Sequence, residues 1–232
     1  MVYNFSFSGL LDTLLPVSCA LCQDPTHSHL PVCRPCLDDF PTIHHCCNCC
    51  ALPLGKDETC GDCQKKPPEF DQVHTLFHYH VPVTNLIQQL KYNDRLEFAC
   101  LFGELLGETI NKSLDLPDLL IPVPLHAGRL RQRGYNQSWE IAKAVHRKTG
   151  IRCSRTTCKR SRKTELQTGL SAADRKRNLR QAFSVSRDVM DSHICIVDDV
   201  MTTGSTLNEM ARSLKRAGAR KVSGLVVARV VA

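Results

Sequence analysis

Short apolar runs of strand length recur along the chain from about residue 70 to its end. The clearest is the Ile-Cys-Ile-Val run at residues 194–197, and a second covers residues 119–125, where prolines end it. Continuous apolar runs are typical of strands that are covered on both faces, as in a parallel sheet. Weaker strand candidates lie at residues 73–79, 182–185 and 222–231.

Amphipathic segments separate these runs. Apolar residues recur in them every three or four positions, which predicts helices with one buried face. These helices cover residues 83–92, 96–110, 139–145 and 207–214. Strands that alternate with helices favour a parallel sheet flanked by helices. We therefore predict an α/β domain over residues 69–232.

The chemistry of this domain is concentrated just after the run at residues 194–197. Asp198 and Asp199 stand where the predicted strand ends, which is the edge where ligands of open α/β sheets bind. A small, hydroxyl-rich loop then opens the next helix, and its residues are Thr202, Thr203, Gly204, Ser205 and Thr206. Backbone N–H groups and the positive end of the helix dipole converge at such a helix start, so the loop is suited to a phosphate group.

Residues 194–206 resemble the signature of type I phosphoribosyltransferases that binds 5-phosphoribosyl-1-pyrophosphate (PRPP). Four apolar residues, two acids, two apolar residues and Thr-Thr-Gly-Ser-Thr follow one another as in that family. The resemblance implies that Asp198 and Asp199 engage the ribose hydroxyls at the catalytic centre. It also implies that residues 202–206 hold the 5′-phosphate and that Mg²⁺ accompanies the pyrophosphate. The alternative is an ordinary strand-turn-helix with a chance acidic pair.

Four C-x-x-C units precede this domain. They are Cys19 with Cys22, Cys33 with Cys36, Cys47 with Cys50, and Cys60 with Cys63. Two such units complete a closed, tetrahedral Cys₄ zinc site, so we predict two structural zinc ions. Sequential pairing of the units is the simpler arrangement, and interleaved pairing is the alternative. Cys46 with Cys49 also fits the spacing of the third unit, and a redox role is the rival to metal binding.

Residues 1–68 are predicted to form a small, Cys-rich domain that ends at the Lys-Lys-Pro-Pro sequence of residues 65–68. So short a segment with few large apolar residues needs metal to fold. The sequence shows neither an apolar run long enough to span a bilayer nor a signal-peptide pattern. We therefore expect no transmembrane segment and a cytoplasmic location, where the 14 cysteines favour metal binding over disulfides.

Positive charge is concentrated in residues 125–181. This stretch holds 16 Lys and Arg against three Asp and Glu, whereas residues 1–68 hold four against seven. Such a surplus indicates a polyanionic ligand, either pyrophosphate or nucleic acid, although a solvated basic face is the plainer interpretation. We predict that the stretch binds single-stranded DNA without strong sequence preference, through Arg160, Arg162 and Lys163 among others. Residues 160–180 also fit a loop that closes over PRPP, with a plain exposed loop as the alternative.

Four features together resemble the ComF/GntX family of competence-associated, phosphoribosyltransferase-like proteins. They are the Ile-Pro-Val-Pro-Leu run that starts at Ile121, the Arg-x-Arg-Gly-Tyr-Asn-Gln-Ser motif that ends at Ser138, the four C-x-x-C units, and a later pattern of Arg162, Thr164, Gln167, Leu170, Arg175, Asn178, Ala182 and Phe183. The resemblance runs nearly end to end. Cysteine knuckles of that family commonly read C-x-x-C-G, whereas Cys50 is followed by Ala51.

The resemblance implies a type I phosphoribosyltransferase-like sheet preceded by a double zinc ribbon. It places Arg129, Arg131 and Arg133 on the pyrophosphate side of the site, and it implies a role in DNA uptake or utilisation during natural transformation, beside DNA-uptake or helicase machinery. Purine-salvage relatives carry a carboxylate where Thr202 stands, so purine salvage is disfavoured and the acceptor stays open; Tyr135 and Trp139 are aromatic residues that could reach the site.

Two functional hypotheses follow from these patterns. One is a phosphoribosyltransferase that uses PRPP with an unknown acceptor. The other is a non-catalytic module that binds single-stranded DNA on a phosphoribosyltransferase scaffold with structural zinc.

Overall fold

The computed structural model describes residues 17–26, 28–55, 58–111, 115–160, 182–185 and 189–231 of the chain. Contacts between Cα atoms divide the chain into two compact units, residues 1–40 and residues 41–232. The larger unit therefore includes residues 41–68 together with the sheet. The domain boundary expected after residue 68 stays a prediction.

The smaller unit is described from residue 17 onward. Its chain makes a turn closed by a β-bridge between Ser18 and Pro25, and it continues into α2 (Arg34–Asp38). Cys33 caps this helix with extended backbone, and a proline occupies the first helical turn, where a missing N–H is not costly.

The larger unit is built on a four-stranded parallel sheet with the order β1-β6-β5-β2. These strands are β1 (Gln72–His78), β6 (Lys221–Arg229), β5 (His193–Met201) and β2 (Leu119–Pro122). β5 and β6 lie in the middle and are buried along almost their whole length, as their apolar sequences predict. A separate antiparallel pair is formed by β3 (Cys158–Arg160) and β4 (Phe183–Val185).

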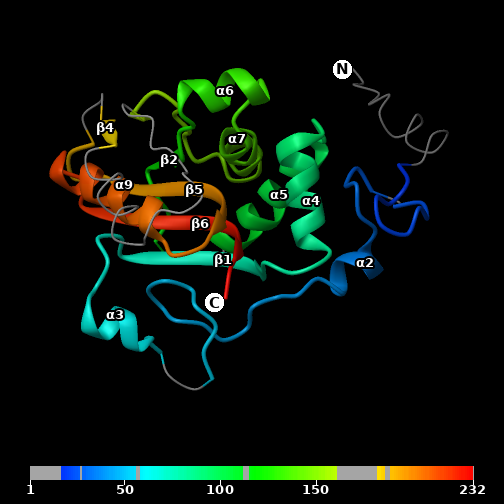
Figure 1. Cartoon of the computed structure of the whole chain (residues 1–232), viewed down its shortest axis with the longest axis horizontal. Helices are drawn as coiled ribbons and strands as arrows, with labels where there is room; N and C mark the ends of the chain where they lie inside the picture. The colour runs from blue at the N-terminus through cyan, green and yellow to red at the C-terminus, as the bar shows by residue number, and fades with distance from the viewer. Residues whose placement is uncertain are drawn as a thin grey trace, which may run out of the picture. The chain divides into compact units, whose positions relative to one another are not determined.

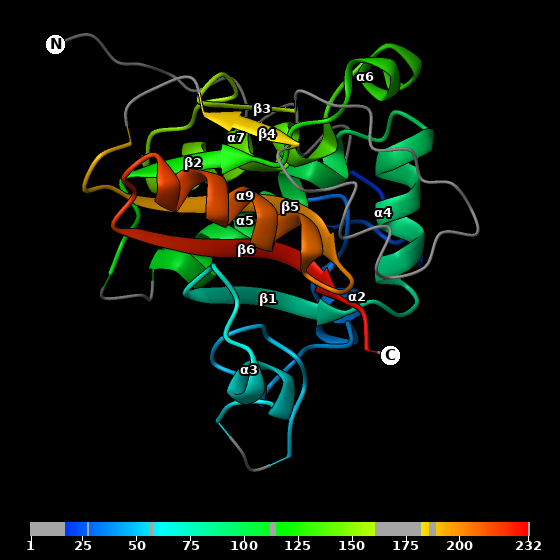
Figure 2. The same cartoon turned by 60° about the vertical axis from the view of Figure 1, so that its left-hand side comes forward.

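Helices cover both faces of the sheet (Figures 1 and 2). α9 (Ser205–Arg216) packs on one face, against β5 and β6. The opposite face is covered by α4 (Val83–Tyr92), α5 (Glu97–Asn111) and α7 (Gln137–Thr149), with α5 and α7 in close contact. Among the described residues of this unit there are also two shorter helices, α3 (Gly61–Lys65) and α6 (Ala127–Arg133).

The predicted fold class, a parallel sheet flanked by helices, is confirmed. Of the expected strands, the one at residues 119–125 is shorter than its apolar run, because β2 ends at Pro122. Val123 still donates its N–H to the carbonyl of Val197 at 2.9 Å, but Pro124 has no N–H with which to continue the ladder. The chain therefore leaves the sheet at this point and turns into α6.

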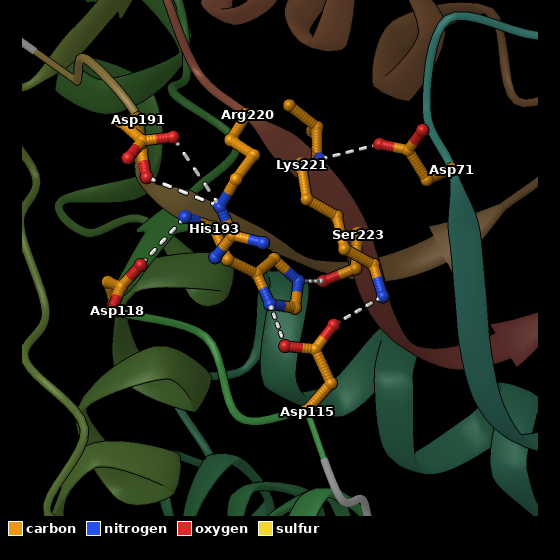
Figure 3. A network of polar contacts seen from close by, with 9 residues as sticks. Asp71, Asp115, Asp118, Asp191, His193, Arg220, Lys221 and Ser223 are labelled. Carbon is orange, nitrogen blue, oxygen red and sulfur yellow. Dashed lines mark hydrogen bonds and ion pairs between the residues drawn. The ribbon is translucent and has the colours of Figure 1, made fainter.

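A polar network closes the amino-terminal edge of the sheet (Figure 3). The backbone N–H of buried His193 donates to Asp118 Oδ2 at 2.7 Å, and its ring Nε2 lies 2.9 Å from Ser223 Oγ. Its Nδ1 faces Asp115 Oδ1 at 3.4 Å, and Lys221 Nζ lies 2.6 Å from the second oxygen of Asp115. The starts of β2, β5 and β6 are thereby joined.

The same network extends to the start of β1. Asp71 accepts a hydrogen bond from the backbone N–H of Val222 at 2.7 Å and pairs with Lys215 Nζ at 2.7 Å. Burial lowers the pKa of His193, although the carboxylate of Asp115 opposes the shift. The hydrogen bond from Lys221 lowers the pKa of Asp115. Each charge at this edge thus faces an opposite charge or a hydrogen-bond partner.

Within the described residues, no helix combines the length and the apolar character that crossing a membrane requires.

Candidate functional site

Asp198 and Asp199 lie near the carboxyl end of β5, and both are buried, at 8% and 4% exposure. Two residues at the start of α7 hold them in place. Ser138 donates its hydroxyl to Asp198 Oδ1 at 2.8 Å, and Gln137 Nε2 lies 3.5 Å from Asp199 Oδ1. The backbone N–H of Asp199 also donates to Asp198 Oδ1, at 2.9 Å. The orientation of both carboxylates is therefore fixed before any ligand arrives.

A lysine from another element neutralises part of this negative charge. Lys91, in the last turn of α4, forms an ion pair with Asp199 Oδ2, and both side chains are mostly shielded from water. Burial alone lowers the pKa of Lys91, but the charge and hydrogen bond of Asp199, with Asp198 behind it, raise the pKa above its ordinary value. Lys91 is thus a cation at the site at any physiological pH.

The negative charge of Asp198 is less well neutralised than that of Asp199, which forms the ion pair with Lys91. Burial raises the pKa of Asp198 well above its usual range, and the adjacent Asp199 raises it further, against the effects of Ser138 and Lys91. Perturbed carboxyl groups of this kind cluster at functional sites, since folding alone does not favour two adjacent buried acids.

The Arg-Gly-Tyr-Asn-Gln-Ser motif builds the support for these acids. Gly134 ends α6 in the left-handed region at φ 81°, and Asn136 caps α7 by accepting from the N–H of Ser138 at 3.0 Å. Asn136 Nδ2 also donates to the carbonyl of Val123 at 3.0 Å, just beyond β2. The hydroxyl of Tyr135 donates to the carbonyl of Leu90, next to Lys91. The motif therefore holds both the acids and their lysine in position.

The loop of residues 202–206 lies between β5 and α9. Gly204 is the N-cap of α9 at φ 74°, and a Cβ placed there would lie 2.5 Å from Met201 Cε. The left-handed backbone therefore favours glycine here, and an added Cβ would displace the end of the Met201 side chain. Thr203 Oγ1 and Ser205 Oγ lie 2.8 Å apart, and the backbone N–H of Ser205 lies 3.4 Å from Thr203 Oγ1. Hydroxyls and the helix N-terminus thus converge, an arrangement suited to an anion.

Arg229 joins this loop to the Cys47–Cys50 unit by hydrogen bonds. The residue is the last of β6 and is buried, at 7% exposure. Its Nη1 donates to the carbonyls of Met201 (3.2 Å) and Thr202, while its Nε donates to the carbonyl of Cys50 at 3.2 Å. One guanidinium group therefore connects the start of the 202–206 loop to the carbonyl of Cys50, in one of the C-x-x-C units.

The sulfur atoms of the cysteines form two groups, each with all Sγ atoms within 4.8 Å of one another. The first group is Cys19, Cys22, Cys33 and Cys36, and the second is Cys47, Cys50, Cys60 and Cys63. A tetrahedral zinc ion with Zn–S bonds of ~2.3 Å places its sulfurs about 3.8 Å apart, so both groups fit structural zinc. The units are grouped sequentially, and Cys46 and Cys49 lie outside both groups.

The two groups differ in their surroundings. Cys22 of the first group is exposed, whereas Cys47, Cys50 and Cys60 belong to the same apolar core cluster as Phe70 and Met201. In each group a backbone N–H donates to a sulfur, from Cys33 to Cys19 at 3.4 Å and from Cys60 to Cys47 at 3.3 Å. The second group is therefore part of the apolar core that includes Met201, which directly precedes the 202–206 loop.

Both knuckles use the same backbone turn. Gln23 follows Cys22 at φ 69°, and Ala51 follows Cys50 at φ 54°. This left-handed conformation favours glycine, which explains why related knuckles read C-x-x-C-G. The departure at Ala51 leaves the turn unchanged.

The arginines expected on the pyrophosphate side lie on α6. Arg129 and Arg131 are exposed, whereas Arg133 donates to Gln137 Oε1 and stacks 5.1 Å from the ring centroid of Tyr92. Arg133 is thus directed toward the residues that support the acids. Contact of any of the three with pyrophosphate stays a prediction.

Arg160 is a further cation near the acids. Burial lowers the pKa of Arg160, and the charge of Arg129 lowers it further, whereas Asp198 acts in the opposite direction. Most of the segment at 160–180, including Arg162 and Lys163, lies outside the described residues.

Sequence reasoning missed Lys91, Ser138, Gln137 and Arg229 as parts of the site. Gln137 and Ser138 belong to the motif that carries the family resemblance, but only its arginines and Arg129 were assigned a role in binding, so the signal was present without this interpretation. Lys91 and Arg229 carry no local signal, because each meets its partners only through the fold.

These features define a type I phosphoribosyltransferase-like protein with a double zinc ribbon. They are a parallel sheet, two adjacent acids and a glycine-containing loop after one central strand, and two Cys₄ groups earlier in the chain. Residues 10–64 match the family model described as "Double zinc ribbon domain", and residues 137–230 match "Phosphoribosyl transferase domain".

Relatives extend this similarity over most of the chain. DNA utilization protein YhgH of Escherichia coli O6:H1 is 38% identical over 90% of this chain and 95% of its own length. Competence protein F of Haemophilus influenzae is 32% identical over 88% of this chain and 93% of its own length. Competence protein ComFC of Bacillus subtilis is 26% identical over 85% and 84%. The chain belongs to the ComF/GntX family, as its motifs indicate.

Proposed function

We propose that this protein binds PRPP as its magnesium complex at the carboxyl edge of the sheet and acts as a phosphoribosyltransferase-like protein in DNA uptake or utilisation. One observation carries the proposal: Asp198, Asp199 and the Gly204 loop stand at the end of the same buried strand. Ribose hydroxyls donate hydrogen bonds, and carboxylates accept them. A terminal phosphate needs the donors that the loop and the helix start supply.

The surrounding residues suit this ligand in charge as well. Ser138 and Gln137 hold the carboxylates in a fixed orientation, so little ordering is needed on binding. Lys91 pairs with Asp199 in the free protein, and its ammonium group is available to the anionic ligand when a ribose hydroxyl takes up part of the carboxylate.

Transfer chemistry at such a site depends on electrostatics. When the C1–O bond of PRPP breaks, positive charge develops on the ribose and negative charge on the pyrophosphate, which Mg²⁺ binds as part of the substrate. Buried acids near the ribose stabilise the first charge, and the cations Lys91 and Arg160 stabilise the second. The acceptor that would take the ribose is not identified by these residues.

The link to DNA rests on the relatives. Proteins named for DNA utilization and for competence are similar to this chain over most of their length, with the phosphoribosyltransferase domain and the zinc ribbon in common. We extend that role to this chain as part of the proposal.

Calorimetric titration of PRPP with Mg²⁺ into wild-type protein and into Asp198→Asn/Asp199→Asn tests the proposal. Hydrogen bonds to charged groups contribute about 1.5–3 kcal/mol each, so the double variant should bind at least ~10-fold more weakly. Gly204→Val should abolish binding, because a β-branched residue is strained at this left-handed position and a larger side chain in the loop would block the 5′-phosphate. Gly150→Val is the matched control, since Gly150 has a similar φ of 75° but nothing within 4 Å of its added Cβ.

Equal PRPP affinity in wild type and double variant, with both shown to be folded by circular dichroism, would contradict the proposal. The acids would then be a remnant of the fold.

Binding of single-stranded DNA is the second candidate function. It is favoured by four exposed cations: Arg129 and Arg131 on α6, Arg155 before β3, and Lys159 in β3. Contacts between such side chains and phosphates make affinity fall steeply with salt concentration. Salt-sensitive binding of an oligonucleotide that persists in Asp199→Ala would support a DNA-binding surface separate from the PRPP site.

A further inference from the structure

A pocket of about 620 Å³ lies between the turn that joins α6 to α7 and the start of β3. This volume is in the range of about 300–1,000 Å³ that small-molecule sites occupy. Apolar side chains from the loop after β2 and from α6 form part of its wall, among them Leu125 and Leu130. The pocket shares Tyr135 and Asn136 with the support of the acids but does not include Asp198 or Asp199.

Trp139 supplies a flat aromatic surface in this pocket. Its ring is half-buried, with Arg155 Cζ 5.7 Å and Lys143 Nζ 6.0 Å from the ring centroid. Cations at this distance are attracted to the ring, which keeps the charged groups close to the stacking surface. A base that stacks on Trp139 would take the place of one of these cations over the ring, and the displaced charge would then lie beside the ligand.

The charge of the pocket wall is strongly positive. Lys143, Arg155, Lys159 and Arg160 line it, against one acid, Glu140, which pairs with Lys143 at 2.5 Å. Arg155 and Lys159 are exposed, so they can meet an anion without losing a buried partner. Glu140 also adds carboxylate oxygens that can accept from ring N–H or amino groups.

We propose that this pocket binds one nucleotide, with its base stacked on Trp139 and its phosphate at Arg155 and Lys159. A base has two flat faces for stacking, polar edges for Glu140 and an attached phosphate for the cations, so a single ligand class satisfies each part of the wall. The nucleotide is either a free mononucleotide or one unit of a single DNA strand. The site differs from the proposed PRPP site because it uses neither the acids nor the Gly204 loop, although Arg160 borders both sites.

The chain contains a single tryptophan, so tryptophan fluorescence, excited selectively, reports on this pocket. Titration with deoxythymidine monophosphate should quench the fluorescence, whereas ribose 5-phosphate, which lacks the base, should not. A short oligothymidylate distinguishes the sources. Quenching by both ligands indicates a mononucleotide site, and quenching by the oligomer alone indicates a unit of a strand. Absence of quenching by either ligand, or equal quenching by ribose 5-phosphate, overturns the proposal.

Variants separate the pocket from general attraction to a basic surface. Arg155→Gln/Lys159→Gln should weaken the nucleotide at least ~10-fold, while the control Arg147→Gln/Arg152→Gln removes the same charge outside the pocket and should leave affinity unchanged. Trp139→Leu, followed by calorimetry, should cost about tenfold through lost stacking. Equal effects of the two charge pairs would overturn the proposal.

The acidic variant distinguishes this site from the PRPP site. Asp198→Asn/Asp199→Asn should keep the fluorescence response to nucleotide even where PRPP binding is lost. Loss of the nucleotide response in this folded variant would mean that the pocket and the acids form one site, which also overturns the proposal.

Discussion

The two edges of the parallel sheet differ in how far their charged groups are paired. At the amino-terminal edge, Asp115 lies between Lys221 and His193, and each charged group has a partner within reach. At the carboxyl edge, Asp198 and Asp199 are adjacent, buried and served by one lysine. The first edge is closed by paired charges, whereas the second leaves two buried acids with one paired lysine. Under the proposed function, folding stability and ligand binding would depend on different ends of the same strands.

This difference has opposite consequences for the dependence of stability on pH. The pKa of buried His193 is lowered by folding, so its contribution to stability is present above its unfolded pKa and is lost as the pH falls. The pKa of Asp198 is raised by folding, so its contribution is present at acidic pH and is lost as the pH rises through the folded pKa. The amino edge therefore weakens as the pH falls, whereas the carboxyl edge weakens as the pH rises from the ordinary pKa of Asp198, 3.8, to its folded pKa of about 8.

The largest expected effect concerns the metal beneath the carboxyl edge. Wild-type protein should contain about two equivalents of zinc by elemental analysis, and Cys60→Ser and Cys33→Ser should each lose about one. Cys60→Ser should also weaken Mg²⁺-PRPP more than ~10-fold, because Arg229 joins the Cys50 carbonyl to the loop at Thr202. Cys33 belongs to the other compact unit, so the Cys33→Ser variant should bind PRPP with unchanged affinity.

A zinc content near zero in protein purified without chelator would remove the metal from this account. If both cysteine variants weakened PRPP equally, the second cluster would have no special connection to the site.

A smaller effect is expected from breaking the amino edge. His193→Ala removes a buried side chain and leaves Ser223 and Asp115 with one partner fewer, which should lower the free energy of unfolding by about 2–3 kcal/mol. PRPP affinity should stay the same, since the site lies at the other edge. Denaturant unfolding and calorimetry measure the two quantities, with exposed His80→Ala as the control. A large loss of PRPP affinity would show that the edges are coupled.

The smallest effect concerns Asp198 itself. Asp198→Asn keeps a group that can accept from Ser138 but removes the titrating carboxyl, so the stability of the variant relative to wild type should rise by about 2 kcal/mol as the pH rises from about 6 to about 8. Comparison of the two proteins in the same buffers cancels the titration of His193 and of the cysteines. A constant difference across this range would mean that Asp198 does not titrate there.

The parts of the fold with a local pattern were predictable from the sequence. The apolar run before Asp198 identified β5, and the C-x-x-C spacing identified the cysteine groups, because both signals lie within a few residues. The elements of the site that join distant segments were not predictable. Ser138 is 60 residues from Asp198, and Arg229 is 179 residues from Cys50, so only the folded chain shows their hydrogen bonds.

The Arg-Gly-Tyr-Asn-Gln-Ser motif shows a subtler limit. Its arginines favoured an anion-binding role, yet its Tyr135, Asn136 and Ser138 cap a helix and fix other residues. A pattern of residue types does not tell whether a polar group faces a ligand or another part of the chain.

Gln23 and Ala51 show what a metal permits in a sequence. Each holds a left-handed backbone at a position that favours glycine, at a cost of about 1–2 kcal/mol. Structural zinc binding supplies roughly 10–16 kcal/mol, so the cysteines alone can hold the turn. If zinc is bound, a residue other than glycine is therefore tolerated after these knuckles, whereas loss of a thiolate would remove a metal ligand. Sequence searches that require the glycine would pass over proteins of this kind.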